Sequence, residues 1–131
     1  RDSPEARLID TFVSAMLLKG NLSREVRDGV RRFAIEGADF DWRKAIDVVI
    51  ENLEETWILE GKAALNYEAL GEVLTYAHLY GQEFPSKNVR MGIICGRLDG
   101  DILQVCHERR ITVFLVSEEG AIETYSPPVI S

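Results

Sequence analysis

Residues 44–62, KAIDVVIENLEETWILEGK, decide the fold of this chain. The two ends of this stretch, residues 44–50 and 56–62, are rich in β-branched residues and predict two strands. The polar residues 51–55 between them predict a turn, so the strands are expected to pair as a hairpin. Asp47 lies in the middle of the first strand, where a charge among aliphatic side chains is costly unless it has a partner.

The second strand of the hairpin ends with two charged residues, Glu60 and Lys62. Residues two apart share one face of a strand, and the hairpin allows Asp47 to join them. Two carboxylates and a lysine suit metal-assisted phosphodiester hydrolysis, because Mg²⁺ binds one or two carboxylates together with water and substrate phosphate. The same residues also fit an ordinary solvated Glu–Lys pair of little energetic weight. The residues alone leave both interpretations open.

A helix is predicted before the hairpin. Ser3 is a suitable N-cap, Pro4 suits the first helical position, and apolar residues recur at helical spacing from Leu8 to Leu17. The pattern over residues 22–42 is poorer, and we interpret it as a strand followed by an irregular crossing.

Helices and strands alternate after the hairpin. Asn66 is a suitable cap for a helix that ends before Gly81, and Asp99 is a suitable cap for another helix. Residues 89–95 and 111–116 are near-continuous apolar runs, which predict buried strands joined by a right-handed parallel crossover. The element order αβββαβαβ predicts an α/β fold, a three-layer sandwich with a central mixed β-sheet.

The composition fits one soluble domain over residues 1–131, with 46% hydrophobic residues available for a core. No apolar run approaches the ~20 residues of a membrane span, and no signal peptide is expected. Cys95 and Cys106 lie in apolar runs, which favours buried thiols over a disulfide framework. We therefore expect an intracellular, cytoplasmic protein without membrane contact.

The net charge of −7 runs against nucleic-acid binding, because proteins that bind phosphates commonly present an excess of Lys and Arg. Basic residues are nevertheless dense in one stretch, while acidic residues gather in the hairpin turn and near the C-terminus. A local nucleic-acid-binding face is therefore expected from Arg27, Arg31, Arg32, Arg43 and Lys44.

The arrangement of Asp47, twelve further residues and then Glu60-Gly61-Lys62 resembles the PD-(D/E)XK nuclease superfamily, which has the restriction-endonuclease-like fold. The following helix resembles the branch related to recombination exonucleases and some archaeal and viral nucleases, in which a Gln-x-x-x-Tyr motif follows the lysine strand. Glu72 occupies the Gln position and Tyr76 the Tyr position, on one helix face. This sequence departs from the family motifs at Glu72 and at Ile46, which replaces Pro.

The resemblance implies a Mg²⁺- or Mn²⁺-dependent nuclease that hydrolyses phosphodiester bonds, with DNA as the expected substrate. Asp47, Glu60 and the carbonyl of Gly61 would hold the metal ion, and Lys62 would assist the attacking water. Family members also carry a Glu on the first helix that completes the metal site, and Glu5 is the best match by position. A surface carboxylate favoured by the helix dipole is an equal alternative for Glu5.

The family resemblance also suggests a homodimer or a subunit of a larger assembly. Two other functions remain open at the level of sequence. A catalytically silent domain of the same fold would act as a nucleic-acid-binding or subunit-interaction module, which the acidic net charge favours. A small-molecule-binding α/β protein fits the outline of the fold but leaves Asp47 unexplained.

Overall fold

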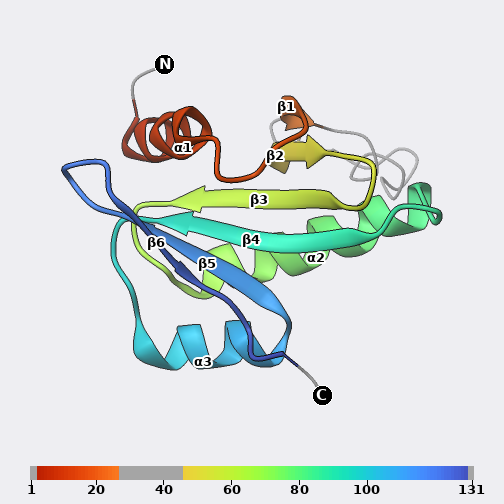
Figure 1. Cartoon of the computed structure of the whole chain (residues 1–131). Helices are drawn as coiled ribbons and strands as arrows, with labels where there is room; N and C mark the ends of the chain where they lie inside the picture. Colours follow the sequence, from red (N-terminus) through yellow and green to blue (C-terminus); the bar gives the residue numbers. More distant parts are fainter. Residues whose placement is uncertain (1–2, 27–45, 130–131) are drawn as a thin grey trace, which may run out of the picture.

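Helices cover both faces of a single six-stranded sheet (Figure 1). The computed structural model describes residues 3–26 and 46–129. Its elements in chain order are α1 (Pro4–Ala15), β1 (Asn21–Val26), β2 (Ile46–Glu51), β3 (Thr56–Lys62), α2 (Tyr67–Glu83), β4 (Val89–Cys95), α3 (Gly100–Glu108), β5 (Ile111–Val116) and β6 (Ile122–Tyr125). Helix α1 lies on one face of the sheet, and α2 and α3 lie on the other (Figure 1). The predicted three-layer α/β sandwich is confirmed.

The sheet is mixed, with its strands in the order β1-β2-β3-β4-β5-β6. Strands β1, β2 and β3 form an antiparallel meander, whereas β3, β4 and β5 are parallel, and β6 is antiparallel to β5. The predicted hairpin and the predicted parallel crossover are therefore both present. Strand β6 is missing from the predicted order, because its four residues, IETY, are partly or fully exposed and contain no apolar run.

The helices begin at the predicted caps. One side-chain oxygen at each start accepts a hydrogen bond of 2.9–3.0 Å from the backbone N–H three residues ahead, and the three caps are Ser3, Asn66 and Asp99. Helix α1 ends at Ala15, short of the apolar spacing that extends to Leu17, because Met16 adopts the left-handed conformation. Helix α2 continues through Gly81 to Glu83, so the predicted stop at this glycine is wrong.

Alternate residues of β3 pack on opposite faces of the sheet. Trp57 and Leu59 belong to the apolar cluster beneath α1, whereas Ile58 belongs to a cluster that includes residues of α2. By this alternation Glu60 and Lys62 extend toward the face that α2 covers. The pleat of one strand thus brings the two charged residues of the predicted site to the same helix.

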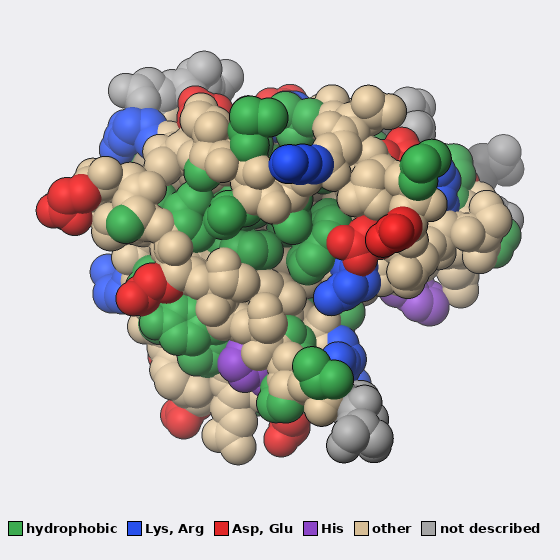
Figure 2. Space-filling model, in the orientation of Figure 1, with side chains coloured by type: hydrophobic (Ala, Val, Ile, Leu, Met, Phe, Trp, Pro, Cys, Tyr) green, Lys and Arg blue, Asp and Glu red, His purple; other side chains and the backbone are tan. Residues whose placement is uncertain are grey.

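Aromatic rings fill the space between α1 and the sheet. The ring centroid of Phe114 lies 4.7 Å from that of Phe12 and 6.0 Å from that of Trp57. Figure 2 shows hydrophobic side chains in the middle of the visible face, with most charged side chains around its rim. Among the residues that the structure describes, Glu60 is the one charged side chain in the buried class. A carboxyl group therefore stands inside an otherwise apolar interior.

Replacing Gly92 by Ala is expected to destabilise the protein. A Cβ atom at Gly92 would lie 2.4 Å from Cδ2 of Leu59 and 3.1 Å from Cε2 of Phe114, inside the packed core. Such overpacking costs about 1–3 kcal/mol of the free energy of unfolding. Gly71→Ala is the matched control, because this helical glycine has nothing within 4 Å of the added atom. It should stabilise the protein by about 0.5–1 kcal/mol. Urea denaturation of both variants measures the two effects, and equal changes would contradict the packing shown.

Candidate active site

The pairing of β2 with both of its neighbouring strands, β1 and β3, is interrupted at Asp47. Strands β1 and β2 pair on either side of this residue but not at it. Glu25, which would face it, has a φ of 52°, a left-handed conformation that is uncommon for residues other than Gly. Along the opposite edge of β2, the pairing with β3 ends at Val48 and Leu59, so Asp47 has no backbone partner in β3. Such local departures from regular backbone geometry cluster at functional sites.

Two carboxyl groups replace the hydrogen bonds that the β2–β3 ladder lacks. The backbone N–H of Asp47 donates to Oε2 of Glu60 over 3.0 Å. In return, the backbone N–H of Gly61 donates to Oδ2 of Asp47 over 2.9 Å. Each acidic side chain therefore accepts a hydrogen bond from a backbone N–H of the opposite strand. This reciprocal bonding brings the two carboxyl groups together.

Burial changes the protonation of this pair. Glu60 is 2% exposed, and burial, followed by the nearby charge of Asp47, raises its pKa to about 9. Burial also raises the pKa of Asp47, although the N–H of Gly61 and the Glu60 carboxyl partly offset this effect. The raised pKa of Glu60 favours the protonated form of this carboxyl at neutral pH.

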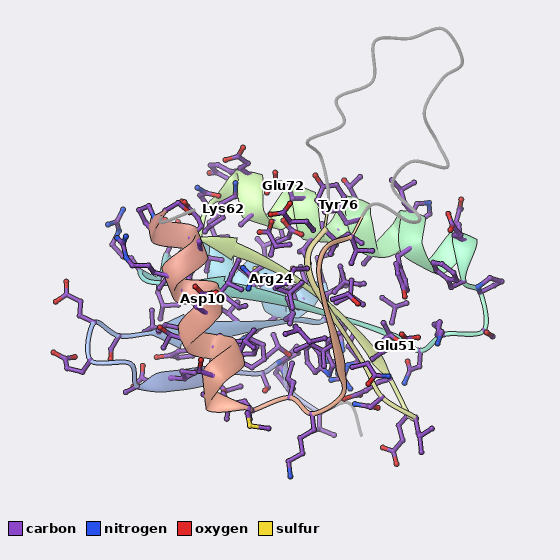
Figure 3. All side chains as sticks on the ribbon, turned by 90° about the horizontal axis from the view of Figure 1, so that it is seen from above. Asp10, Arg24, Glu51, Lys62, Glu72 and Tyr76 are labelled. Carbon is purple, nitrogen blue, oxygen red and sulfur yellow. The ribbon has the colours of Figure 1, made fainter. Side chains whose placement is uncertain are left out.

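Lys62 is the last residue of β3, and its side chain reaches the first turns of α2. Its Nζ atom is 3.1 Å from Oε1 of Glu68 and 3.2 Å from Oε1 of Glu72. Figure 3 shows Lys62 and Glu72 near each other. Burial of this side chain, which is 19% exposed, lowers the pKa of the ammonium, but the two glutamates outweigh burial and leave the pKa raised. Lys62 is therefore a fixed positive charge, and its field also lowers the pKa of Asp47.

Helix α1 packs closely over the end of β3. A Cβ atom at Gly61 would lie 2.8 Å from Cδ1 and Cγ1 of Ile9 and 3.6 Å from the carbonyl oxygen of Glu5. The missing side chain at position 61 makes room for this approach, and it places α1 on the face of the sheet opposite to the one toward which Glu60 extends. Within the described residues, however, the Glu5 carboxylate has no hydrogen bond or ion pair to Asp47, Glu60 or Lys62.

Arg24 supplies a second positive charge near the pair. It pairs with Val48 in the β1–β2 register, and its guanidinium forms an ion pair of 3.1 Å with Asp10 of α1 (Figure 3). The charge of Arg24 contributes to lowering the pKa of Asp47, after the hydrogen bonds and Lys62. The Arg24–Asp10 pair thus links β1 to α1 beside the point where the ladders break.

The structure brings together Asp47, Glu60, Gly61, Lys62 and Glu72, all of which are sequence-predicted site residues. Tyr76 lies one turn after Glu72 on α2, and its ring packs with Ile46, Val49 and Ile58 in an apolar cluster, where it is 7% exposed. Tyr76 therefore belongs to the apolar core between α2 and strands β2 and β3. The predicted nucleic-acid-binding residues Arg27, Arg31, Arg32, Arg43 and Lys44 lie outside the described residues.

Sequence reasoning missed three residues of this site. Glu68 stands four residues before Glu72 on the first turns of α2, a spacing that puts both on one face and was a usable signal. Arg24 and Asp10 belong to different elements, and their contact depends on the register of β1 and on the position of α1. No local pattern in the sequence encodes that contact.

The carboxyl oxygens of Asp47 and Glu60 are of the kind that bind hard divalent cations. Mg²⁺ prefers carboxylate oxygens and is often bound by only one or two of them, with water or phosphate at its other positions. Among the described residues, no group of three or more His, Cys, Asp or Glu side chains is arranged to hold a metal ion.

Comparisons with protein-family models, with curated proteins and with solved structures find no significant match to this chain. In the described part of the chain, no helix combines the length and the apolar character required to cross a membrane. The site is thus described by its own geometry: the buried Glu60 carboxyl and the half-buried Asp47 carboxyl at an interrupted strand ladder, with a lysine beside them.

Glu60→Gln is expected to stabilise the protein at pH 8 and to flatten its pH dependence. Between the ordinary pKa of 4.5 and the raised pKa of about 9, the folded state holds a proton that the unfolded state releases. The free energy of unfolding of the wild type therefore falls as pH rises through this window, by up to about 1.4 kcal/mol per pH unit. Glutamine keeps an acceptor for the N–H of Asp47 and does not ionise.

Urea denaturation between pH 5 and pH 8.5 measures this difference. Glu54→Gln is the control, because this glutamate in the hairpin turn is exposed. Its profile should run parallel to that of the wild type. A Glu60→Gln profile that also runs parallel would show that the carboxyl at position 60 ionises normally in the folded protein.

Proposed function

We propose that this chain is a metal-dependent phosphodiesterase, and more particularly a nuclease of the PD-(D/E)XK type that acts on DNA. The observation that carries the proposal is the reciprocal bonding of Asp47 and Glu60 at the break in the ladders of β2. A buried Glu60 carboxyl beside the half-buried carboxyl of Asp47 is costly, so a fold that keeps them together needs a reason beyond stability. Holding a divalent cation is such a reason.

Asp47 and Glu60, with the carbonyl of Gly61, would hold Mg²⁺ or Mn²⁺. A bound ion of this kind lowers the pKa of water and neutralises charge that develops on the phosphate. Asp47 is already oriented by the N–H of Gly61, and Glu60 by the N–H of Asp47, so both ligands are preorganised. Glu5, whose backbone lies over Gly61, is proposed as a further ligand that acts through water.

Lys62 would supply a fixed positive charge beside the reacting phosphate. Its pKa is raised by the two neighbouring glutamates, so the side chain stays an ammonium ion at neutral pH and donates hydrogen bonds. A preorganised donor of this kind stabilises charge that develops in the transition state and orients the attacking water. In this role Lys62 does not accept a proton from water.

The expected substrate is DNA, and the predicted basic stretch would contact its backbone. Two buried free thiols, Cys95 and Cys106, fit a reducing, cytoplasmic setting. A homodimer or a larger assembly remains part of the proposal on the basis of the family resemblance.

The wild-type protein is expected to cut at least one form of DNA in the presence of Mn²⁺ or Mg²⁺. A panel of single-stranded, duplex, flapped and four-way-junction substrates tests this directly. Asp47→Asn and Lys62→Ala should each lower kcat by about 100-fold or more, because each removes a ligand or a charge from the reacting centre. Asp101→Asn, an exposed carboxylate in the first turn of α3, should leave the rate unchanged. Wild-type activity that survives both site substitutions would exclude the assignment.

Mn²⁺ affinity is expected to rise with pH. The ion must displace the proton held by Glu60, whose pKa is about 9, so the apparent affinity should increase by about tenfold per pH unit between pH 6.5 and 8.5. Isothermal calorimetry in buffers of different ionisation enthalpy should detect about one proton released per ion bound. Asp47→Asn should remove the binding, whereas a pH-independent affinity would place the ion elsewhere on the protein.

A catalytically silent nucleic-acid-binding or interaction module is the second candidate. It is favoured by the net charge of −7 and by the two carboxylates, Glu68 and Glu72, that pair with Lys62, since both features repel phosphate. Absence of Mn²⁺ binding and of cleavage, with the fold intact, would select this candidate.

A further inference from the structure

Lys62 is held by two acidic side chains of the same helix. Glu68 and Glu72 are four residues apart, on the first turns of α2, and both carboxylates lie within 3.2 Å of Nζ. A lysine has a long, flexible side chain that loses rotamer freedom when it is fixed, and a single solvated ion pair seldom holds it in place. Two acceptors on one rigid helix face restrict the ammonium far more than one acceptor does.

The backbone around this contact is itself firmly held. Helix α2 begins at the Asn66 cap, whose side chain accepts from the N–H of Ala69. The N–H of Leu65 donates to the carbonyl of Arg97, and the N–H of Gly96 donates to the carbonyl of Ala63. The short connection between β3 and α2 is thus bonded to the residues that follow β4. The distance between Lys62 and the two glutamates is therefore fixed by the main chain on both sides.

We infer that Glu68 and Glu72 act as positioning residues, forming a carboxylate clamp that holds the Lys62 ammonium beside the Asp47–Glu60 pair. This inference rests on the proposed nuclease function, in which Lys62 faces the reacting phosphate. Glu68 and Glu72 act through Lys62 and do not touch the reacting atoms. The clamp also explains why a Glu stands at position 72, where the resembling family has Gln: a carboxylate pairs with an ammonium more strongly than an amide does.

The two arms of the clamp are unequal. The Glu72 side chain is 30% exposed and the Glu68 side chain is 66% exposed, so solvent screens the Glu68 arm more strongly. Glu72→Gln should therefore lower kcat more than Glu68→Gln does. Each single variant keeps one arm, so the double variant should lose more than the two single effects combined.

A double-mutant cycle tests the clamp. The kcat of Glu68→Gln/Glu72→Gln should fall by about tenfold to 100-fold, the range expected for misplacement of a catalytic group. KM and the Mn²⁺ affinity should stay within about twofold, because neither the ligands nor the substrate contacts change. In a Lys62→Ala background the same double substitution should have no further effect on kcat. Glu54→Gln, in the turn at the opposite end of β3, is the matched control.

An activity-independent readout separates this inference from the proposed function. In ¹⁵N NMR, the clamped Lys62 ammonium should give a resolved, slowly exchanging signal that is assigned by Lys62→Ala and broadened in the double variant. A wild type that cuts no substrate would overturn the nuclease proposal while the NMR comparison still tested the clamp. An active wild type whose kcat is unchanged in the double variant would overturn the clamp, as would an equal loss in the Lys62→Ala background.

Discussion

The reciprocal hydrogen bonding of Asp47 and Glu60 is the constraint on which the rest of the site depends. Two strands that pair regularly up to Val48 and Leu59 separate at the next residue, and side chains take over the bonding there. The same exchange brings the two acids together, and burial, followed by the charge of Asp47, raises the pKa of Glu60 to about 9. The local strand geometry and the altered protonation of Glu60 are therefore linked.

Two helices hold this arrangement from opposite faces of the sheet. Helix α1 packs directly onto Gly61, where any larger residue would meet Ile9, and helix α2 supplies the acidic partners of Lys62. The site lies at the end of β3, where the chain leaves the sheet. Strand β4 pairs with β3 and strand β5 pairs with β4, all in parallel, and both are buried along most of their length, so they form a rigid centre of the sheet.

Much of this fold follows from patterns in the sequence, and the exceptions have physical reasons. Strands such as β3 and β4 match their predicted bounds, because each has an apolar stretch and is flanked by polar residues of the preceding turn or loop. Strand β6 has no such run, and its place depends on pairing with β5. In the site, the E-x-K spacing and the hairpin predicted that Asp47 meets Glu60. The left-handed backbone at Glu25 and the ion pair of Arg24 with Asp10 depend on tertiary packing, so local patterns do not reveal them.

The members of the site that touch one another, from Asp47 to Glu72, follow one another along a hairpin and the next helix. Contacts between residues close in sequence close short loops, which cost little chain entropy and form quickly. Strands β4 and β5 join the sheet through helical crossovers, which are slower to complete, and β6 then pairs with β5. We therefore expect the carboxyl pair and its lysine to assemble early in folding, as a locally encoded unit onto which the remaining strands are added.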